Sequence, residues 1–354
     1  MSIVTELARP EIVSMAGYTS ASHDEALVRL NANESPLRRV GDTTQRGLNW
    51  YPLDRPTELE RRLASLVNQP AERITVTRGS SEAIDLLIRT FCRPGEDAVL
   101  ICPPTFGMYA VYANVQGATI QRAPLTAAPA FDLDVDRIRE TITDATKLVF
   151  ITSPNNPTGN VMSPTAVDAV VAATRGRAVV VIDAAYLEFA ECDDPAQRYA
   201  NESHVVVLRT LSKAFALAGA RCGVIIGDTD LSLLIRKVFA PYSIATPVVE
   251  AILGVLAQSS PTDDKNRFDT LRAERNRVSQ RLATLPAVRA VYRSDANFVL
   301  AEFIDPATAI TAVEKVGFLI RDFSKADAHP NSLRITIGTR EQNDTVLSAL
   351  GTLS

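Results

Sequence analysis

The residue that most suggests chemistry is a lysine in a run of small and apolar residues. Lys213 follows an apolar run over 205–210 and precedes the letters AFALAG. An amine with such neighbours is a candidate for partial desolvation, which lowers its pKa and frees its lone pair. That lone pair is what Schiff-base formation with a carbonyl compound requires. Taken alone, however, a lysine is most often a surface charge.

Two further groups of residues suggest an anion site. Gly79, Ser80 and Ser81 follow a β-branched run over 74–78 and open an apolar-periodic stretch that predicts a helix. Free N–H groups and the dipole at a helix N-terminus favour a phosphate, and the hydroxyls add donors. Arg221, which follows Lys213 in the chain, could clamp the same phosphate. An ordinary helix cap explains the serines equally well.

A carboxylate and an asparagine turn complete the set. Asp183 ends the apolar run 178–183, where an ionised carboxylate costs free energy unless it is paired. A protonated pyridine nitrogen would be such a partner, and a helix cap or a salt bridge is the alternative. The string SPNNPTGN presents Asn155 and Asn156 after the run 147–152, although these residue types also dominate turns without a function.

The order of these residues carries more weight than any one of them, because each follows its own predicted strand. Nearly continuous apolar runs are typical of strands buried on both faces of a mostly parallel sheet, and helical stretches lie between most of them. In such α/β sheets, ligands bind outside the carboxyl ends of the strands. The predicted strands are 74–78, 98–102, 147–152, 178–183, 205–210 and 222–227.

The last third of the chain has a different pattern of predicted helices and strands. A long charged helical stretch over 262–286 precedes four short strands mixed with two helices, which predicts a smaller α+β domain. We expect a large domain over 45–250, and a small domain formed by 1–44 and 251–354. The four short strands are expected at 288–294, 297–303, 318–323 and 333–339.

Composition excludes several classes of protein. The chain has 354 residues, a net charge of −4 and a pI near 5.6, which argues against nucleic-acid binding. Three histidines and four cysteines without a CxxC pair argue against a zinc site or any other metal site, and reduced thiols are expected. We find no signal peptide and no uncharged stretch that could span a bilayer, so we expect a cytoplasmic protein without membrane contact.

The string TLSKAFALAGARCG over 210–223 resembles the lysine signature of class II aminotransferases, which are fold type I pyridoxal-phosphate enzymes. More narrowly, the chain resembles the histidinol-phosphate aminotransferase family. The resemblance implies a pyridoxal 5'-phosphate-dependent transaminase that converts histidinol phosphate and 2-oxoglutarate to imidazole acetol phosphate and L-glutamate. The strings that carry it span almost the whole chain: LNANESPL (30–37), CPPTFGMYAV (102–111), SPNNPTGN (153–160), APYSIATPV (240–248), FLIRDF (318–323) and LRITIGTRE (333–341).

The resemblance implies roles for individual residues around the cofactor ring. Lys213 would carry the cofactor as a Schiff base and later move the substrate proton. Asp183 would pair with the pyridine nitrogen, and Asn156 and Tyr186 would contact the phenolic oxygen. Tyr109 would stack on the ring.

The resemblance also implies phosphate and substrate contacts. Tyr51 would reach the cofactor phosphate from the partner subunit of a homodimer with shared active sites. Arg321 and Arg334 would bind the substrate phosphate or the carboxylates of glutamate. Tyr18, Asn33 and Asn156 would line the substrate pocket. The expected ligands of the cofactor phosphate within one chain are Ser80, Ser81, Thr210, Ser212 and Arg221.

One departure and several alternatives remain. Related chains often read Asp-Glu-Ala-Tyr where this one reads Asp-Ala-Ala-Tyr, so a contact made by that glutamate, at position 184, is in doubt. An aromatic amino-acid aminotransferase and a threonine-phosphate decarboxylase share the cofactor residues. A ligand-sensing regulator would carry an added helix-turn-helix, for which we find no room. A dehydrogenase would need a G-x-G-x-x-G after the first strand, which is missing.

Overall fold

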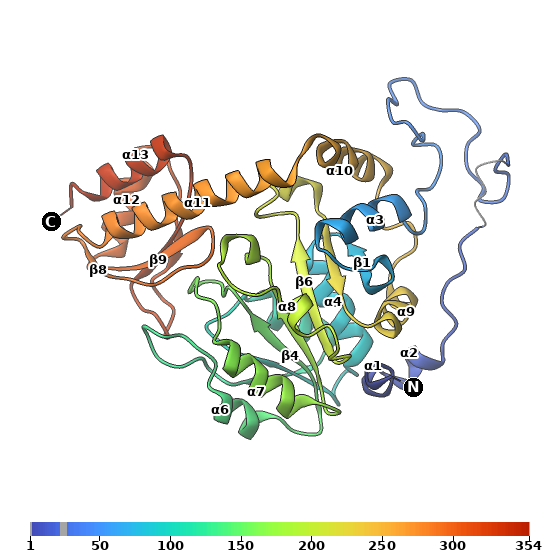
Figure 1. Cartoon of the computed structure of the whole chain (residues 1–354), viewed down its shortest axis with the longest axis horizontal. Coiled ribbons are helices and arrows are strands. Elements are labelled where there is room, and N and C mark those ends of the chain that lie inside the picture. Colours follow the sequence, from blue (N-terminus) through green and yellow to red (C-terminus); the bar gives the residue numbers. More distant parts are fainter. Residues whose placement is uncertain (1, 22–26, 354) are drawn as a thin grey trace.

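The computed structural model describes residues 2–21 and 27–353. A seven-stranded sheet lies at the centre of its larger body (Figure 1). Only β7 runs antiparallel to its neighbours, and the other strands are parallel. This sheet confirms the expected α/β fold of the large domain. In sheet order the strands are β1 (Ile74–Thr77), β7 (Gly223–Ile226), β6 (Val205–Thr210), β5 (Val179–Asp183), β4 (Thr146–Thr152), β2 (Ala98–Ile101) and β3 (Thr119–Arg122).

Helices cover both faces of this sheet, and alternate side chains of each strand enter opposite core clusters. In β5, Val180 and Ile182 join one cluster, whereas Val179 and Val181 join the other. The first face packs against α3 (Thr57–Leu66), α6 (Val135–Thr141), α7 (Pro164–Thr174), α8 (Pro195–Arg198) and α10 (Thr246–Gln258). The second packs against α1 (Ile3–Leu7), α2 (Pro10–Ser14), α4 (Ser80–Phe91), α5 (Met108–Gln116) and α9 (Thr229–Val238). Short 3-10 turns are η1 (Ala71–Arg73), η2 (Leu187–Phe189) and η3 (Ala218–Ala220).

A second, four-stranded antiparallel sheet forms the smaller body. Its order is β10 (Arg321–Phe323), β11 (Ser332–Thr336), β9 (Phe298–Phe303) and β8 (Val288–Val291). The long helix α11 (Pro261–Leu282) runs from the large body to this sheet, and with α12 (Pro306–Lys315) and α13 (Arg340–Leu350) it covers one face (Figure 1). Leu333 and Ile335 of β11 pack into that helical core, so Arg334 between them points to the opposite face.

The packing differs from the expected domain division at the N-terminus. Val4, Ala8 and Ile12 join the core cluster that contains α4 and α9, so α1 and α2 belong with the large body, because their apolar sides are buried there. Helix α10 also packs on the large sheet. We therefore propose that the small domain begins at α11.

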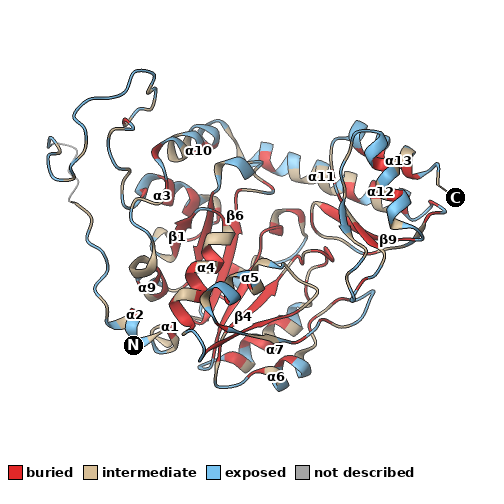
Figure 2. Cartoon of the chain, turned by 180° about the vertical axis from the view of Figure 1, so that it is seen from behind, coloured by how far each residue is buried: buried red, intermediate tan, exposed pale blue. Residues whose placement is uncertain are grey.

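Residues 15–56, which we call the N-terminal arm, run mostly outside the body over their described parts, 15–21 and 27–56 (Figure 2). They contact it at Tyr242 and at Glu250 of α10. Many large apolar side chains of the arm are exposed to solvent, which is unusual for a monomer. They are Tyr18, Leu27, Val28, Leu30, Leu37, Val40, Leu48, Trp50 and Tyr51. Among the described residues, no helix is long and apolar enough to cross a membrane.

Candidate active site

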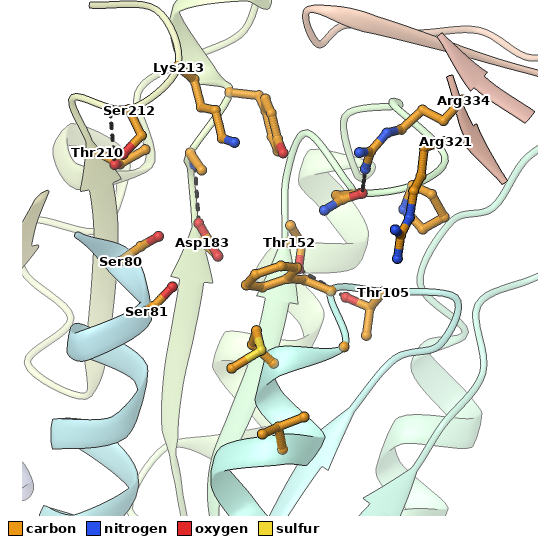
Figure 3. A pocket seen from close by; sticks show the side chains of 18 of the residues that line it. Ser80, Ser81, Thr105, Thr152, Asp183, Thr210, Ser212, Lys213, Arg321 and Arg334 are labelled. Atoms are coloured by element: carbon orange, nitrogen blue, oxygen red, sulfur yellow. Dashed lines mark hydrogen bonds between the residues drawn. The ribbon is translucent and has the colours of Figure 1, made fainter. Parts of the chain in front are cut away.

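A cavity of about 670 Å³ opens at the carboxyl ends of the parallel strands, between the two bodies. Figure 3 shows Lys213 and Asp183 in its middle, with Ser80 and Ser81 on one side and the two arginines of the small sheet on the other. The sequence therefore predicted most of one real site. The expected residues that line the cavity are Ser80, Ser81, Asn156, Asp183, Tyr186, Thr210, Ser212, Lys213, Arg221, Arg321 and Arg334.

Lys213 lies in the turn that follows β6, with its side chain open to the cavity. Its pKa is below that of a free lysine, mainly because the cavity walls desolvate the ammonium form. Positive charge on Arg334 and Arg221 lowers this pKa further, and Asp183 opposes the shift. The Nζ atom is 5.8 Å from the ring centre of Tyr186. A lysine in this position more readily presents a neutral, nucleophilic amine.

Asp183 is the last residue of β5 and is buried at the base of the cavity. Burial raises the pKa of its carboxyl group, and two hydrogen bonds act in the opposite direction. Tyr109 Oη donates to Asp183 Oδ2 at 2.8 Å, and the backbone N–H of Ala185 donates to Oδ1 at 3.2 Å. A carboxylate held in this way is suited to pair with one cationic ring nitrogen.

The expectation that Tyr109 stacks on a cofactor ring is wrong. Its side chain is fully buried, packs on Phe150 with ring centres 4.6 Å apart, and does not line the cavity. Tyr109 instead lies in the first turn of α5, and this position directs its side chain toward the sheet. Phe106, in the loop before this helix, is the aromatic residue that lines the cavity there.

An anion site lies beside Lys213, where α4 begins. Gly79 caps this helix with a φ of 84°, and a Cβ atom at Gly79 would lie 2.8 Å from Arg221 Nη2. Glycine therefore allows both the backbone turn and the close approach of the guanidinium. Arg221 Nη1 donates to Ser212 Oγ at 3.2 Å, and the backbone N–H of Ser212 donates to Thr210 Oγ1 at 3.1 Å. Hydroxyls, a guanidinium and a helix N-terminus thus converge on one concavity, which fits a phosphate group.

The opposite wall comes from the small sheet. Arg334 Nη1 donates to Asn156 Oδ1, which links β11 to the SPNNPTGN turn of the large body. Burial lowers the pKa of Arg334, while the pKa of the nearby Tyr186 hydroxyl is raised to about 12, also by burial. Tyr186 therefore remains a protonated hydrogen-bond donor at neutral pH.

Besides Tyr109, three expected residues lie outside this cavity, and these three are in the N-terminal arm. Tyr51 stacks on Tyr242 with ring centres 4.7 Å apart, Tyr18 lies beside the same Tyr242, and Asn33 is exposed. None of them lines the cavity of its own chain. Their roles therefore stay predictions that depend on a second subunit.

Several residues of the cavity wall were not predicted from the sequence. The signals for some of them were present, because residues 105–108 follow the predicted strand 98–102 and Thr152 ends the strand 147–152. Phe323 ends the string FLIRDF. The missed residues are Thr105, Phe106, Gly107, Met108, Val111, Thr152, Pro157, Ala185 and Phe323.

The structure also shows what surrounds Ala184, where related chains often have glutamate. Ala184 is fully buried directly after β5, and its backbone N–H donates to the carbonyl oxygen of Leu208, the residue before Arg209, at 3.0 Å. Arg209 instead forms ion pairs with Glu188 at 2.7 Å and Asp194 at 3.1 Å. Two other carboxylates thus neutralise this arginine.

Comparison with known proteins identifies the class. The chain belongs to the aminotransferase class I and II family, whose model matches residues 27–350. Within it, the histidinol-phosphate aminotransferase of Yersinia pseudotuberculosis serotype IB is 40% identical over 352 residues, which cover 99% of this chain and 91% of the relative. This relative confirms the resemblance that the sequence strings suggested.

Solved structures agree on the fold. The histidinol-phosphate aminotransferase of Clostridium acetobutylicum has a TM-score of 0.77 at 22% identity and covers 86% of this chain and 90% of its own. The histidinol-phosphate aminotransferase of Sinorhizobium meliloti, solved in complex with pyridoxal-5'-phosphate, has a TM-score of 0.74 at 21% identity and covers 86% of this chain and 82% of its own.

Proposed function

We propose that this protein is a pyridoxal 5'-phosphate-dependent transaminase of histidine biosynthesis. It exchanges an amino group between histidinol phosphate and 2-oxoglutarate, and the products are imidazole acetol phosphate and L-glutamate. One observation carries this proposal. A lysine of lowered pKa lies beside a buried carboxylate, with a phosphate-sized anion site on one side and two arginines on the other.

The residues fit the cofactor group by group. Ser80, Ser81, Thr210, Ser212 and Arg221 would hold its phosphate, and the carboxylate of Asp183 would hold its ring nitrogen in the protonated form. Asn156 and Tyr186 would contact its phenolic oxygen, and Phe106 offers an aromatic face. When bound, pyridoxal phosphate supplies an electron sink for the bond that breaks at the substrate α-carbon.

Lys213 performs the proton transfer in this proposal. Its neutral amine takes the proton from the substrate α-carbon and returns it at the next step, which general acid–base catalysis requires of a group with a tuned pKa. Arg321 and Arg334 bind the anionic end of each substrate. A guanidinium group can hold a carboxylate or a phosphate through two parallel hydrogen bonds, so the same arginines serve both half-reactions.

We further propose a cytoplasmic homodimer with shared active sites. The exposed apolar side chains of the N-terminal arm support a second copy as their partner, and Tyr51 would then reach the neighbouring site. Co-expression of Lys213→Ala with Tyr51→Ala tests this, because a mixed dimer restores one complete site. Activity of the mixed dimer above that of both parents is expected, and activity equal to the parental mean would contradict shared sites.

Comparison of three substrates tests the reaction. Turnover with histidinol phosphate should exceed turnover with phenylalanine, and threonine phosphate should release no carbon dioxide. A preference for phenylalanine would make the protein an aromatic aminotransferase, and release of carbon dioxide would make it a lyase. Either outcome would overturn the proposed reaction and leave the fold unchanged.

A further inference from the structure

Two like charges face each other in the wall of the cavity. Arg321 and Arg334 are direct partners in the antiparallel pair of β10 and β11. Like charges in such positions destabilise a sheet unless something compensates for them. Among residues 2–21 and 27–353, no carboxylate lies within ion-pair distance of either guanidinium, and the side chain to which Arg334 donates a hydrogen bond is the neutral Asn156.

Aromatic rings take the place of a carboxylate here. The Phe323 ring centre is 5.5 Å from the guanidinium carbon of Arg334 and 5.8 Å from that of Arg321. Phe298 flanks Arg334 from another direction at 5.0 Å. A π face attracts a cation without occupying its N–H donors, whereas a carboxylate would occupy them. Consistent with this, Arg334 Nε is buried without a hydrogen-bond partner.

Further aromatic side chains, from both bodies, support the ring of Phe323. The ring of His329 contacts it edge-on at 5.7 Å and contacts Phe131 of the large body at 6.4 Å. Tyr292 packs on Phe131 at 5.1 Å. Burial lowers the pKa of His329, so this side chain stays neutral and adds no third positive charge. The position of Phe323 between the two arginines is therefore well determined.

We propose that Phe323 is a positioning residue that holds Arg321 and Arg334 together and unneutralised, and so selects a substrate with a phosphate group. Two guanidinium charges match the charge of a phosphate monoester, which is about −1.5 to −2 at neutral pH. A single carboxylate matches only one of them. This inference rests on the proposed function, because it explains how the same wall favours the phosphorylated substrate.

The variant Phe323→Leu tests it, because leucine keeps an apolar side chain and removes the π face. We expect KM for histidinol phosphate to rise about tenfold, equivalent to about 1.4 kcal/mol, with kcat within about twofold of wild type. KM for glutamate should rise by about threefold or less. Phe323→Tyr keeps the π face and should restore KM to within about threefold of wild type.

Phe268→Leu is the matched control. Phe268 also lies near an arginine, with the Arg267 guanidinium carbon 5.5 Å from its ring centre, and it also makes edge contacts with other rings, but it does not line the cavity. It should lose a similar amount of thermal stability and keep the wild-type KM. Equal KM changes in Phe323→Leu and Phe268→Leu would overturn the proposal, as would a Phe323→Tyr enzyme that is as defective as the leucine variant.

A binding measurement separates this inference from the proposed function. Calorimetric titration of the cofactor-loaded enzyme with inorganic phosphate probes the two arginines, since the cofactor phosphate already fills its own site. Phe323→Leu should bind inorganic phosphate about tenfold more weakly than wild type. Unchanged phosphate affinity refutes the role of Phe323. Weakened affinity in an enzyme that does not turn over histidinol phosphate refutes the proposed reaction alone.

Discussion

Replacement of Tyr109 by phenylalanine removes one hydrogen bond at the base of the cavity and keeps the ring that packs on Phe150. In the wild type, Tyr109 Oη donates to Asp183 Oδ2 at 2.8 Å, and both side chains are buried. A hydrogen bond to a charged group contributes about 1.5–3 kcal/mol. Because about 1.4 kcal/mol corresponds to one pKa unit, its loss should raise the pKa of Asp183 by about one to two units above its already raised value.

The pH dependence of kcat/KM measures this shift. Asp183 must be ionised to pair with a cationic ring nitrogen, so activity falls as the pH drops through its pKa. The acid limb of Tyr109→Phe should therefore move to higher pH by about one to two units. Tyr112→Phe, on the same helix, removes a hydroxyl that is not hydrogen-bonded to Asp183 and should leave the profile unchanged. Superimposable acid limbs for all three enzymes would refute the reasoning.

Two further substitutions test the anion sites on either side of Lys213. Gly79→Ala should release the cofactor more readily on dialysis, because the added Cβ would press on Arg221. Gly95 has a similar φ but open space around it, so Gly95→Ala should retain the cofactor. Equal loss of cofactor from both variants would implicate backbone strain alone. Arg334→Gln should raise KM for glutamate and histidinol phosphate at least tenfold, since a charged hydrogen bond contributes about 1.5–3 kcal/mol. Arg289→Gln, on the exposed side of the same sheet, is the control and should leave both KM values unchanged. Unchanged KM values in Arg334→Gln would exclude Arg334 from substrate binding.

The sequence predicted the central part of the site because parallel strands bring their carboxyl ends to one edge of a sheet. Asp183 and Lys213 are distant in the chain, yet Asp183 ends β5, Lys213 lies in the turn after β6, and these two strands are neighbours. The strand pattern does not predict which of Phe106 and Tyr109 lines the cavity. Which of the two faces the cavity depends on where helix α5 begins, and Met108 is its first residue. A shift of one turn would exchange their positions, and the letters alone do not determine it.

The N-terminal region could not be placed from its own residues. Helices α1 and α2 are too short to be stable alone, and their packing against α9 depends on a surface formed much later in the chain. The arm that follows carries Tyr18, Asn33 and Tyr51, whose proposed contacts lie on another subunit. Sequence periodicity reports which side of an element is apolar, and it does not report which chain covers it.

The most direct test of the account is to locate the cofactor lysine by chemical trapping. Borohydride reduction of the cofactor-loaded enzyme fixes the cofactor to the lysine that carries it, and trypsin does not cleave after a modified lysine. Mass spectrometry should then find the modified peptide 210–221, TLSKAFALAGAR, uncut after Lys213. An unmodified peptide ending at Lys213, with the cofactor mass on Lys147, Lys237, Lys265, Lys315 or Lys325, would contradict the central claim.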